Sequence, residues 1–447
     1  MDLDDAESRW RDASSDHERA RAVGLLVRAG FVAARAVASG ARPSGVSRAV
    51  ANMAAAAVDA SVRAWLCDRA LEEALAESRT TWTLDVMVAL AKMHPPAVAP
   101  ALAMARTARD EATPEAVVWT QERSAALASL SCLVEPAARR AVVDEALSIA
   151  RATRVHDRND RIVVNAAPGL VAHAPEALFA LVESVTLGDP AWTWARIARS
   201  STGALRFRAL RRALQNPVGS ARPLVEAADL LPVELLPRAL EMASAMYPSV
   251  NFGATALRAV LPAWAAAGNV RDALVRARAI PEPGERGTTL ARLVAHVAER
   301  EREALLREAM ASMALCQPQF AHQPSDCLSR AIEDLAPLGV LSQLERSDVA
   351  LGGEALAKLA ARSDGETRAR LLQRLAETGE VESLTPVARE LPAEAVFPRW
   401  MRALRTFSAR GEEFLEDDCG WGFVQWCPLT ATIGGDEGLR GAAAAMG

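Results

Sequence analysis

The sequence contains few aromatic residues. Trp, Phe and Tyr together make up 4% of the 447 residues, whereas hydrophobic residues as a whole make up 51%. The apolar content is therefore mostly Ala, Leu and Val. Ala and Leu lead the helix scale, while aromatic and β-branched residues favour strands. The scarcity of aromatics therefore favours closely packed helices over sheets, and strand-like alternation is missing from the first 410 residues.

Lysine is almost absent from the chain. Lys92 and Lys358 are the only two, so nearly all of the 51 basic residues are arginine. The net charge is −5 and the sequence pI is about 5.9, which argues against a general nucleic-acid or membrane-surface binder. Arginine can bind carboxylates and phosphates in a bidentate manner. However, a composition rich in Ala and Arg also follows from a GC-rich genome, so arginine abundance alone indicates no function.

Signals for secretion and membrane insertion are missing as well. The six cysteines are scattered without a C-x-x-C pair, which is typical of a reducing cytoplasm. The acidic start of the sequence has no apolar core of a signal peptide, and no stretch of 18 apolar residues occurs. We therefore expect a cytoplasmic protein with no membrane partner.

Motifs for catalysis and cofactor binding are not found. HEXXH, GxSxG and the P-loop pattern are absent. Cys316, His322, Asp326 and Cys327 offer zinc-ligand types in one loop, but they lack the paired spacing of a structural zinc site. The sequence therefore predicts no catalytic residue, no cofactor and no metal site, and the protein is not expected to be an enzyme.

A degenerate helical repeat is what the sequence does contain. Helix pairs rich in Arg, Ala and Leu recur about every 30 to 36 residues, and Pro, Gly, Asp and Asn punctuate them. The clearest units start at Ala221, Gly253 and Arg286, which are 32 and 33 residues apart. One helix pair cannot bury its apolar stripe alone and must stack on a neighbour. The period therefore predicts an all-α fold, an α-solenoid of stacked antiparallel helix pairs.

In period and in its use of small residues, this pattern resembles the tetratricopeptide and HEAT-type α-solenoid superfamilies. The W-x₂-L-G-x₂-Y signature of true tetratricopeptide repeats is missing. The pattern is also similar to Ala/Leu-rich repeats attached to effector domains in bacterial signalling and defence proteins. We predict N-terminal helical repeats over 1–120, regular solenoid repeats over 121–410, and a short non-repeat tail that is acidic and rich in Gly and Trp over 411–447.

An acid-free stretch from Pro190 to Val225 is the first candidate for partner binding. Its arginines share helix faces with one another and are interleaved with aromatics, an arrangement that can bind phosphate, an acidic peptide or stacked bases. Alternatively, the arginines pair with acids on neighbouring repeats and the aromatics fill the core. The stretch also contains Phe207 and Arg222, and its candidate residues are Trp192, Trp194, Arg196, Arg199, Arg206, Arg208, Arg211 and Arg212.

The C-terminal tail is the second candidate. An acidic block over 412–418 precedes Trp421, Phe423 and Trp426, and the following LTATI segment is interpreted as part of a short hairpin or an extended tail. We hypothesise that the tail docks on the solenoid within the same chain, with its aromatics in a groove and its carboxylates near arginines. A cap on the last repeat, or a contact for an external partner or protease, are the alternatives.

Together these features favour a scaffold or adaptor that binds another protein or an acidic peptide on its repeat surface. The alternative is a regulated bacterial signalling or defence component whose tail is a switch or a protease-recognised segment. Nucleic acid is disfavoured by the net charge.

Overall fold

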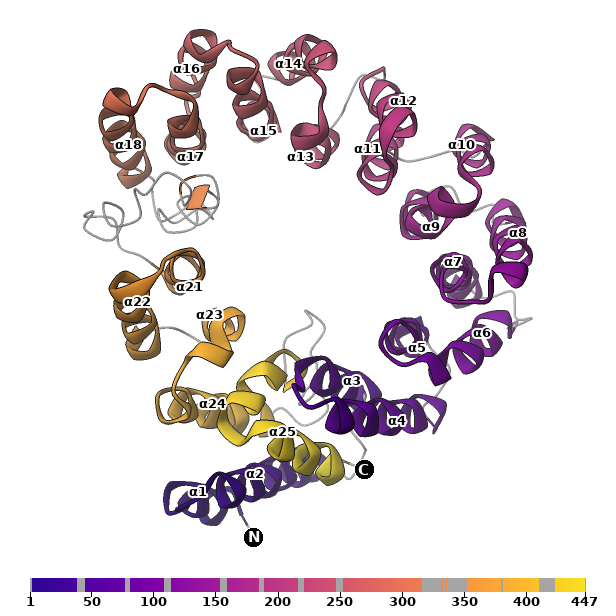
Figure 1. The fold of residues 1–447 in the computed structure, drawn as a ribbon, viewed down its shortest axis with the longest axis vertical. Helices are drawn as coiled ribbons and strands as arrows, with labels where there is room; N and C mark the ends of the chain where they lie inside the picture. The colour runs from indigo at the N-terminus through magenta and orange to yellow at the C-terminus, as the bar shows by residue number, and fades with distance from the viewer. Residues whose placement is uncertain are drawn as a thin grey trace. The chain divides into compact units, whose positions relative to one another are not determined.

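The structure is a computed structural model. It describes residues 2–37, 45–76, 81–107, 114–152, 159–184, 189–215, 221–246, 252–315, 331–332, 335, 352–378, 381–409 and 423–446. Every regular element in these ranges is a helix (Figure 1). No helix within them is long and apolar enough to cross a membrane. The all-α fold class predicted from composition and periodicity is confirmed.

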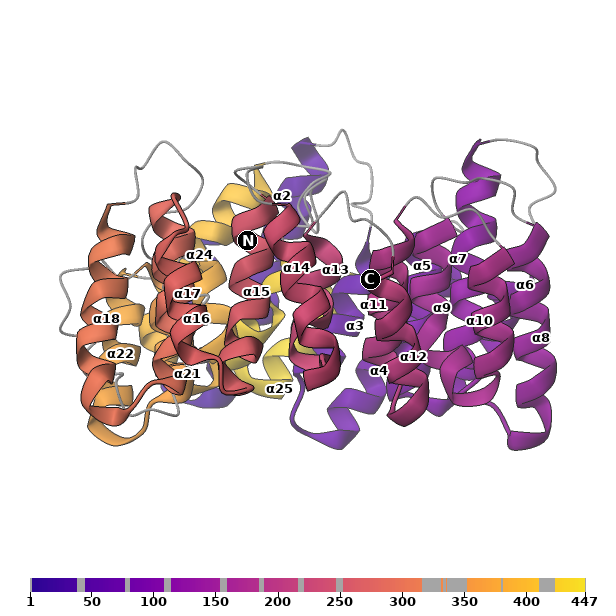
Figure 2. The same cartoon turned by 90° about the horizontal axis from the view of Figure 1, so that it is seen from above.

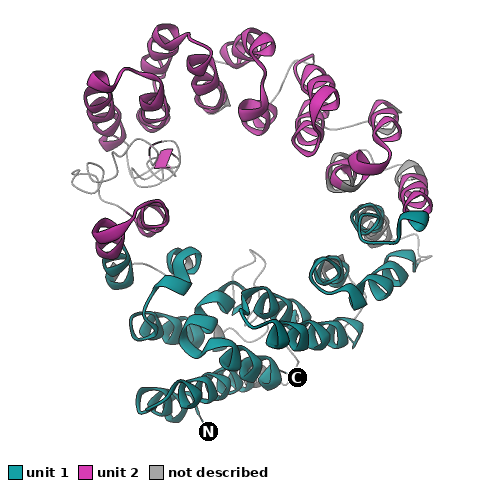
Figure 3. Cartoon of the chain, in the orientation of Figure 1, with its two compact units in different colours: residues 1–138, 372–447 teal, residues 139–371 magenta. Residues whose placement is uncertain are grey.

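The chain divides into two compact units. Unit 1 combines Met1–Ala138 with Leu372–Gly447, and unit 2 comprises Arg139–Leu371 (Figure 3). Unit 1 therefore contains both ends of the chain. The boundaries predicted after residues 120 and 410 mark where the sequence repeat is regular, whereas the two units are defined by contacts in space. The predicted boundaries therefore stay predictions.

Unit 2 is a stack of helix pairs in two layers, in which each first-layer helix packs on the next one along the chain. The first layer consists of α9 (Asn159–His173), α11 (Pro190–Ser200), α13 (Arg222–Ala227), α15 (Phe252–Ala266) and α17 (Pro283–Leu293). The second layer consists of α10 (Pro175–Ser184), α12 (Gly203–Ala213), α14 (Leu236–Ala245), α16 (Val270–Arg278) and α18 (Glu299–Ala314). Figure 1 shows the two layers on opposite sides of this unit, and Figure 2 shows its helices running alongside one another. At its two ends the unit also contains most of α8 (Pro136–Ala152), together with α21 (Gly353–Arg362) and the start of α22 (Gly365–Thr378).

Local sequence signals set where these helices begin and how closely they approach. Asp189 precedes α11, and its side chain accepts a hydrogen bond from the backbone N–H of Trp192, with Pro190 in the first turn. Glu282 caps α17 in the same way. Gly287 lies where α17 meets α18, and a Cβ there would stand 2.8 Å from the carbonyl oxygen of Ala309. Capping residues and small residues therefore fix the helix starts and the close packing of the pairs.

Side chains bond neighbouring repeats at a nearly constant sequence separation. Arg196 donates to Glu226, Arg199 to Asp229 and Arg278 to Glu308, and each pair is 30 residues apart. Equivalent positions of successive repeats therefore lie side by side, as stacking requires. The chain is a divergent helical-repeat solenoid.

Unit 1 joins helices from the two ends of the sequence. Its N-terminal helices are α1 (Leu3–Arg11), α2 (Asp16–Val37), α3 (Val46–Ala56), α4 (Ala60–Ala76), α5 (Thr81–Met93), α6 (Val98–Arg106) and α7 (Pro114–Leu130), with the short 3₁₀ helix η1 (Pro95–Ala97). Its C-terminal elements, after the end of α22, are α23 (Val381–Leu384), the 3₁₀ helix η7 (Thr385–Glu390), α24 (Ala393–Ser408), the 3₁₀ helix η9 (Phe423–Trp426) and α25 (Cys427–Met446). α25 packs on α2 and α24, and also on α3 and α4.

The C-terminal segment is helical, so the expected hairpin or extended tail is wrong. In α25, Gly434 and Gly438 face Val23 of α2, and Gly441 lies against Gly24, where an added Cβ would stand 3.1 Å from the Gly441 backbone. From sequence alone, glycine predicts a break in a helix because its helix propensity is low. Here its missing side chain lets two helices approach closely, and that packing outweighs the low propensity.

Candidate functional site: the surface of α11 and α13

Four arginines of the acid-free stretch, Arg196, Arg199, Arg208 and Arg212, pair with carboxylates of neighbouring repeats. Glu226 accepts hydrogen bonds at 2.7 Å from Arg196 and forms an ion pair at 2.9 Å with Arg199, which also bonds Asp229 at 2.6 Å. Partial burial alone would lower the pKa of Arg199, but its hydrogen bonds and charge pairing with Asp229 and Glu226 raise it overall. Acidic residues that are missing from this stretch of the sequence are therefore supplied by adjacent helices. This agrees with the alternative that the arginines pair with acids on neighbouring repeats.

The arginines of the stretch face two different layers. Arg196 and Arg199 on α11 pair forward with the first-layer segment that follows α11, whereas Arg208 and Arg212 on α12 pair backward with α10. Their acceptors on α10 are Glu176, at 2.9 Å from Arg208, and Glu183, at 2.6 Å from Arg212. The structure therefore separates the sequence cluster into two pairs.

The two remaining arginines of α12 are Arg206 and Arg211. The Nε group of Arg206 donates to the carbonyl oxygen of Ser201 at 2.8 Å, so Arg206 fastens the turn between α11 and α12. Arg211 is exposed. Phe207 has 41% of its surface exposed on the same helix.

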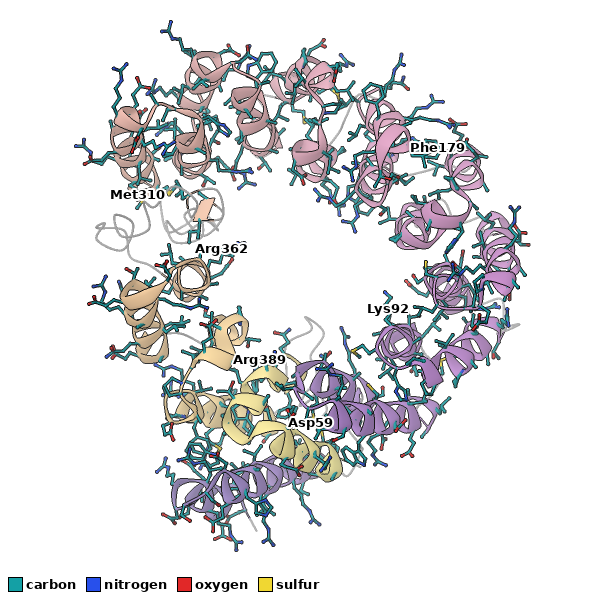
Figure 4. The ribbon with its side chains drawn as sticks, in the orientation of Figure 1. Asp59, Lys92, Phe179, Met310, Arg362 and Arg389 are labelled. Atoms are coloured by element: carbon teal, nitrogen blue, oxygen red, sulfur yellow. The ribbon has the colours of Figure 1, made fainter. Side chains whose placement is uncertain are left out.

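The aromatic residues of the stretch have different environments. Trp194 is buried and packs against Phe179 of α10 with ring centroids 4.9 Å apart. The guanidinium of Arg208 lies over the ring of Phe179 (Figure 4), 4.2 Å from its centroid. Trp192 is only partly buried, and Arg222 of α13 stacks over its ring at 4.6 Å. Trp194 is therefore a core residue, and Trp192 lies at the surface.

One continuous surface combines charge and apolar area on the first layer. Trp192, Arg196 and Arg199 follow helical spacing along one face of α11, and Arg222 and Val225 do so on the adjacent α13. The side chains of Arg196 and Arg199 are each 41% exposed, and Val225 is 44% exposed. We call these five residues the α11–α13 surface. Arg196 donates through Nη1 to Glu226, which leaves further guanidinium N–H groups for a ligand, whereas Arg199 already engages Nε, Nη1 and Nη2 with Glu226 and Asp229.

The tail residues are placed differently from the arginines. Phe423 and Trp426 are buried inside unit 1, whereas Trp421 and the acidic block over 412–418 lie outside the described residues. Phe423 and Trp426 thus pack within unit 1, where η9 contacts α3. A contact of Phe423 or Trp426 with an external partner would require the segment to leave unit 1.

Of the three described cysteines, Cys67 and Cys427 are buried and Cys132 is exposed. Burial raises the pKa of the Cys427 thiol to about 12, and burial also raises the pKa of the Cys67 thiol. Both sulfurs are therefore protonated at neutral pH and poor nucleophiles. Within the described ranges, no three His, Cys, Asp or Glu side chains gather as metal ligands. The loop with Cys316, His322, Asp326 and Cys327 lies outside those ranges.

Comparison with known proteins identifies no family for this chain. No protein-family model matches the chain, and no curated protein matches it significantly. A solved structure described as a circular tandem repeat protein with novel repeat topology and enhanced subunit contact surfaces is 17% identical, over 99% of this chain and 86% of that one. Its TM-score is 0.13. A score this low supports no structural or functional argument, so the fold rests on the helices and inter-repeat bonds described above.

Proposed function

We propose that this chain is a non-catalytic, cytoplasmic scaffold that binds a protein partner on its repeat surface, with the α11–α13 surface as the contact. The observation that carries the proposal is the coincidence of a partly exposed Trp, three arginines and an exposed Val on two adjacent helices. Tryptophan and arginine are the residue types that contribute most binding energy at protein interfaces.

The ion pairs on this surface hold its arginines in place before a partner arrives. Arg196 and Arg199 share Glu226 as a common acceptor, and Arg222 is stacked on Trp192. Side chains that are already ordered lose less conformational entropy on binding. The α11–α13 surface is therefore organised in advance to receive a partner.

The charge balance of the surface favours an acidic partner segment. Arg196 and Arg199 pair with Glu226 and Asp229, while Arg222 stacks on Trp192, so the three arginines exceed the two carboxylates by one charge. A carboxylate of the partner can accept the guanidinium donors that Glu226 and Asp229 do not use. The overall charge of −5 opposes a polyanion such as nucleic acid.

The second layer supplies a matched control for the experiment. Arg208 and Arg212 are 44% and 46% exposed and each pairs with a carboxylate of a neighbouring repeat, just as Arg196 and Arg199 do. Exposed pairs of this kind contribute about 0.2–1 kcal/mol each, so both double variants should fold.

The test captures partners from the native host with wild type, R196S/R199S and R208S/R212S, followed by mass spectrometry and titration of the purified partner. We expect R196S/R199S to lose the partner while R208S/R212S retains it, with unchanged melting for both. Equal retention by the two variants would place the contact elsewhere, and loss in both would show that general positive charge is responsible.

A second candidate role follows from the position of α25 between N-terminal helices. In a regulated signalling or defence component, release or cleavage of the segment after residue 410 would free surfaces of α2 and α3 that it now covers. Limited proteolysis with and without host extract would test it. A host-dependent cut before Phe423 favours this role, and resistance under both conditions argues against it.

A further inference from the structure

A second acid-free stretch runs from Arg19 to Val58 and is longer than the one from Pro190 to Val225. It contains most of α2 and all of α3. Both helices belong to unit 1, whereas the α11–α13 surface belongs to unit 2. Any basic surface on α2 is therefore a separate site from the one proposed above.

One exposed stripe of α2 alternates arginine with aliphatic side chains. Arg21, Leu25, Arg28 and Val32 follow one another at intervals of four, three and four residues, so they lie along one line of the helix surface. Both arginines are exposed, Val32 has 58% of its surface exposed, and Leu25 is half-buried. The buried face of α2, which contains Val23, packs on α25. We call these four exposed or half-buried residues the α2 stripe.

The two arginines of the α2 stripe carry charge that is not neutralised. Among the described residues, no side-chain hydrogen bond, ion pair or ring contact involves Arg21 or Arg28. Arg19 on the same helix differs, because it pairs with Glu394 of α24 at 2.8 Å. The arginines of the α2 stripe therefore keep their full set of guanidinium donors for an external carboxylate, unlike the paired arginines of the α11–α13 surface.

The alternation of charged and aliphatic groups on one stripe indicates the kind of partner. A helix that lies in a membrane interface places its basic and apolar residues on opposite faces, whereas here they share a line. Single-stranded nucleic acid is bound by stacking on aromatic side chains, and the α2 stripe has none. A row that repeats every 3.5 residues is the seam along which two helices pack side by side. The α2 stripe therefore fits another helix.

From this pattern we propose that the α2 stripe docks an amphipathic helix of a partner protein, in which acidic and aliphatic residues alternate at the same spacing. The acidic side chains bond the two free arginines, and the aliphatic side chains pack on Leu25 and Val32. Ala29 and Ala33 are small and only partly buried beside the α2 stripe, so they leave a groove for a ridge of the partner helix. This contact does not depend on whether the α11–α13 surface binds a partner.

The probe is a phage-displayed library of helical peptides that are randomised along one face. It is selected on the full-length wild-type chain and counter-selected on R21E/R28E. We expect the enriched peptides to carry acidic and aliphatic residues in alternation, at intervals of three and four positions. Failure to enrich peptides over the counter-selection, or enriched peptides without acidic residues, would overturn the proposal.

Charge reversal then tests the contact with the enriched peptides by fluorescence anisotropy. We expect at least about a tenfold weaker Kd for R21E/R28E, because like charges then face each other. R271E/R300E is the matched control and should bind as wild type does, since Arg271 and Arg300 are also exposed and, among the described residues, unpaired. A peptide whose acidic residues are replaced by lysine should bind R21E/R28E more tightly than wild type. Equal loss in the two double variants would reduce the contact to general charge attraction and contradict the proposal.

A second pair of variants tests the aliphatic part of the α2 stripe. Val32→Asp should weaken the enriched peptides at least about tenfold, whereas Val275→Asp, at a position that is 65% exposed on α16, should leave their Kd unchanged. Thermal melting of each variant reports folding, and if R21E/R28E melted below wild type, V32D would decide. Phosphatidylserine vesicles provide the last arm: vesicle binding that R21E/R28E abolishes would assign the α2 stripe to a lipid surface and overturn the proposal.

Discussion

The carboxylate of Asp436 in α25 accepts a hydrogen bond from the backbone N–H of Val58 at 3.0 Å, although 378 residues separate the two. Its second oxygen accepts from the N–H of Asp59 (Figure 4). Val58 and Asp59 form the turn between α3 and α4, where backbone donors have no helical partner. The C-terminal helix therefore satisfies backbone groups near the N-terminus, in addition to covering apolar surface there.

Replacing this carboxylate should loosen unit 1. Asp436→Ala leaves the two backbone donors of Val58 and Asp59 without their acceptor, and we expect a loss of about 1 kcal/mol in the free energy of unfolding. Urea denaturation followed by circular dichroism measures it. Glu437→Ala is the control, because Glu437 forms a surface ion pair with Arg440 within the same helix. A loss for E437A equal to that for D436A would contradict the assigned role.

Two glycines of α25 should respond in opposite ways to the same substitution. A Cβ at Gly434 would stand 2.8 Å from Cγ2 of Val23, whereas one at Gly438 would meet its nearest atom, Cγ1 of Val23, at 3.5 Å. The backbone of α25 is non-helical at Gly435, with a φ of 60°, so Gly→Ala at the flanking positions gains less helix propensity than the ~1 kcal/mol of a helix interior. Only Gly434→Ala must push Val23 aside, at a cost of about 1–3 kcal/mol. Thermal melting should therefore show G438A equal to or above wild type and G434A below it. The reverse order would exclude the observed packing of α25 on α2.

The repeat was accessible from sequence because it depends on local signals. Units predicted to start at Ala221, Gly253 and Arg286 correspond to helices that begin at Arg222, Phe252 and Pro283. Pro, Gly and capping residues act on the backbone beside them, so their effect can be inferred without a structure. The predicted starts of these three units therefore lie within a few residues of the observed helix starts.

The ion-pair partners of the arginines and the conformation of the C-terminal segment could not be predicted, because both depend on packing between residues far apart in the sequence. Whether Arg196 meets Glu226 or solvent is set by the register between stacked repeats, which a separation of 30 residues does not reveal. Likewise, α25 is kinked at Gly435, between Gly434 and Gly438, and the packing role of Gly434, Gly438 and Gly441 depends on Val23 and Gly24 at the other end of the chain. Their spacing of four and three residues was the one available signal.

Acid should weaken unit 2 through a specific ion pair. Arg278 bonds both oxygens of Glu308 at 2.8 Å, and these hydrogen bonds lower the pKa of Glu308 from its ordinary value of 4.5. A depressed folded-state pKa stabilises the fold above the unfolded value and the stabilisation is lost as pH falls through the folded value. Stability should therefore fall on acidification below about pH 4.5.

The variant Glu308→Gln isolates this contribution. It should be less stable than wild type at neutral pH, and the difference should shrink as the pH is lowered, because wild type then loses the same charge. Urea unfolding at a series of pH values measures the difference. Glu303→Gln on the same helix is the control, since Glu303 and Arg307 are 4.0 Å apart and both largely exposed. A difference between E308Q and wild type that stays constant with pH would rule out the pair as its source.

The two tryptophans of α11 should separate stability from binding. Trp194 is 5% exposed and packs on Phe179, so Trp194→Ala should cost about 3–5 kcal/mol of unfolding free energy, as for other large core truncations. Trp192 is partly exposed and the guanidinium of Arg222 stacks on its ring, so Trp192→Ala should cost less than Trp194→Ala. Denaturation gives both values, and partner titration with W192A gives the binding effect. If the α11–α13 surface is the contact, W192A loses affinity while its fold persists; a W192A that binds normally would remove Trp192 from the interface, whatever W194A does.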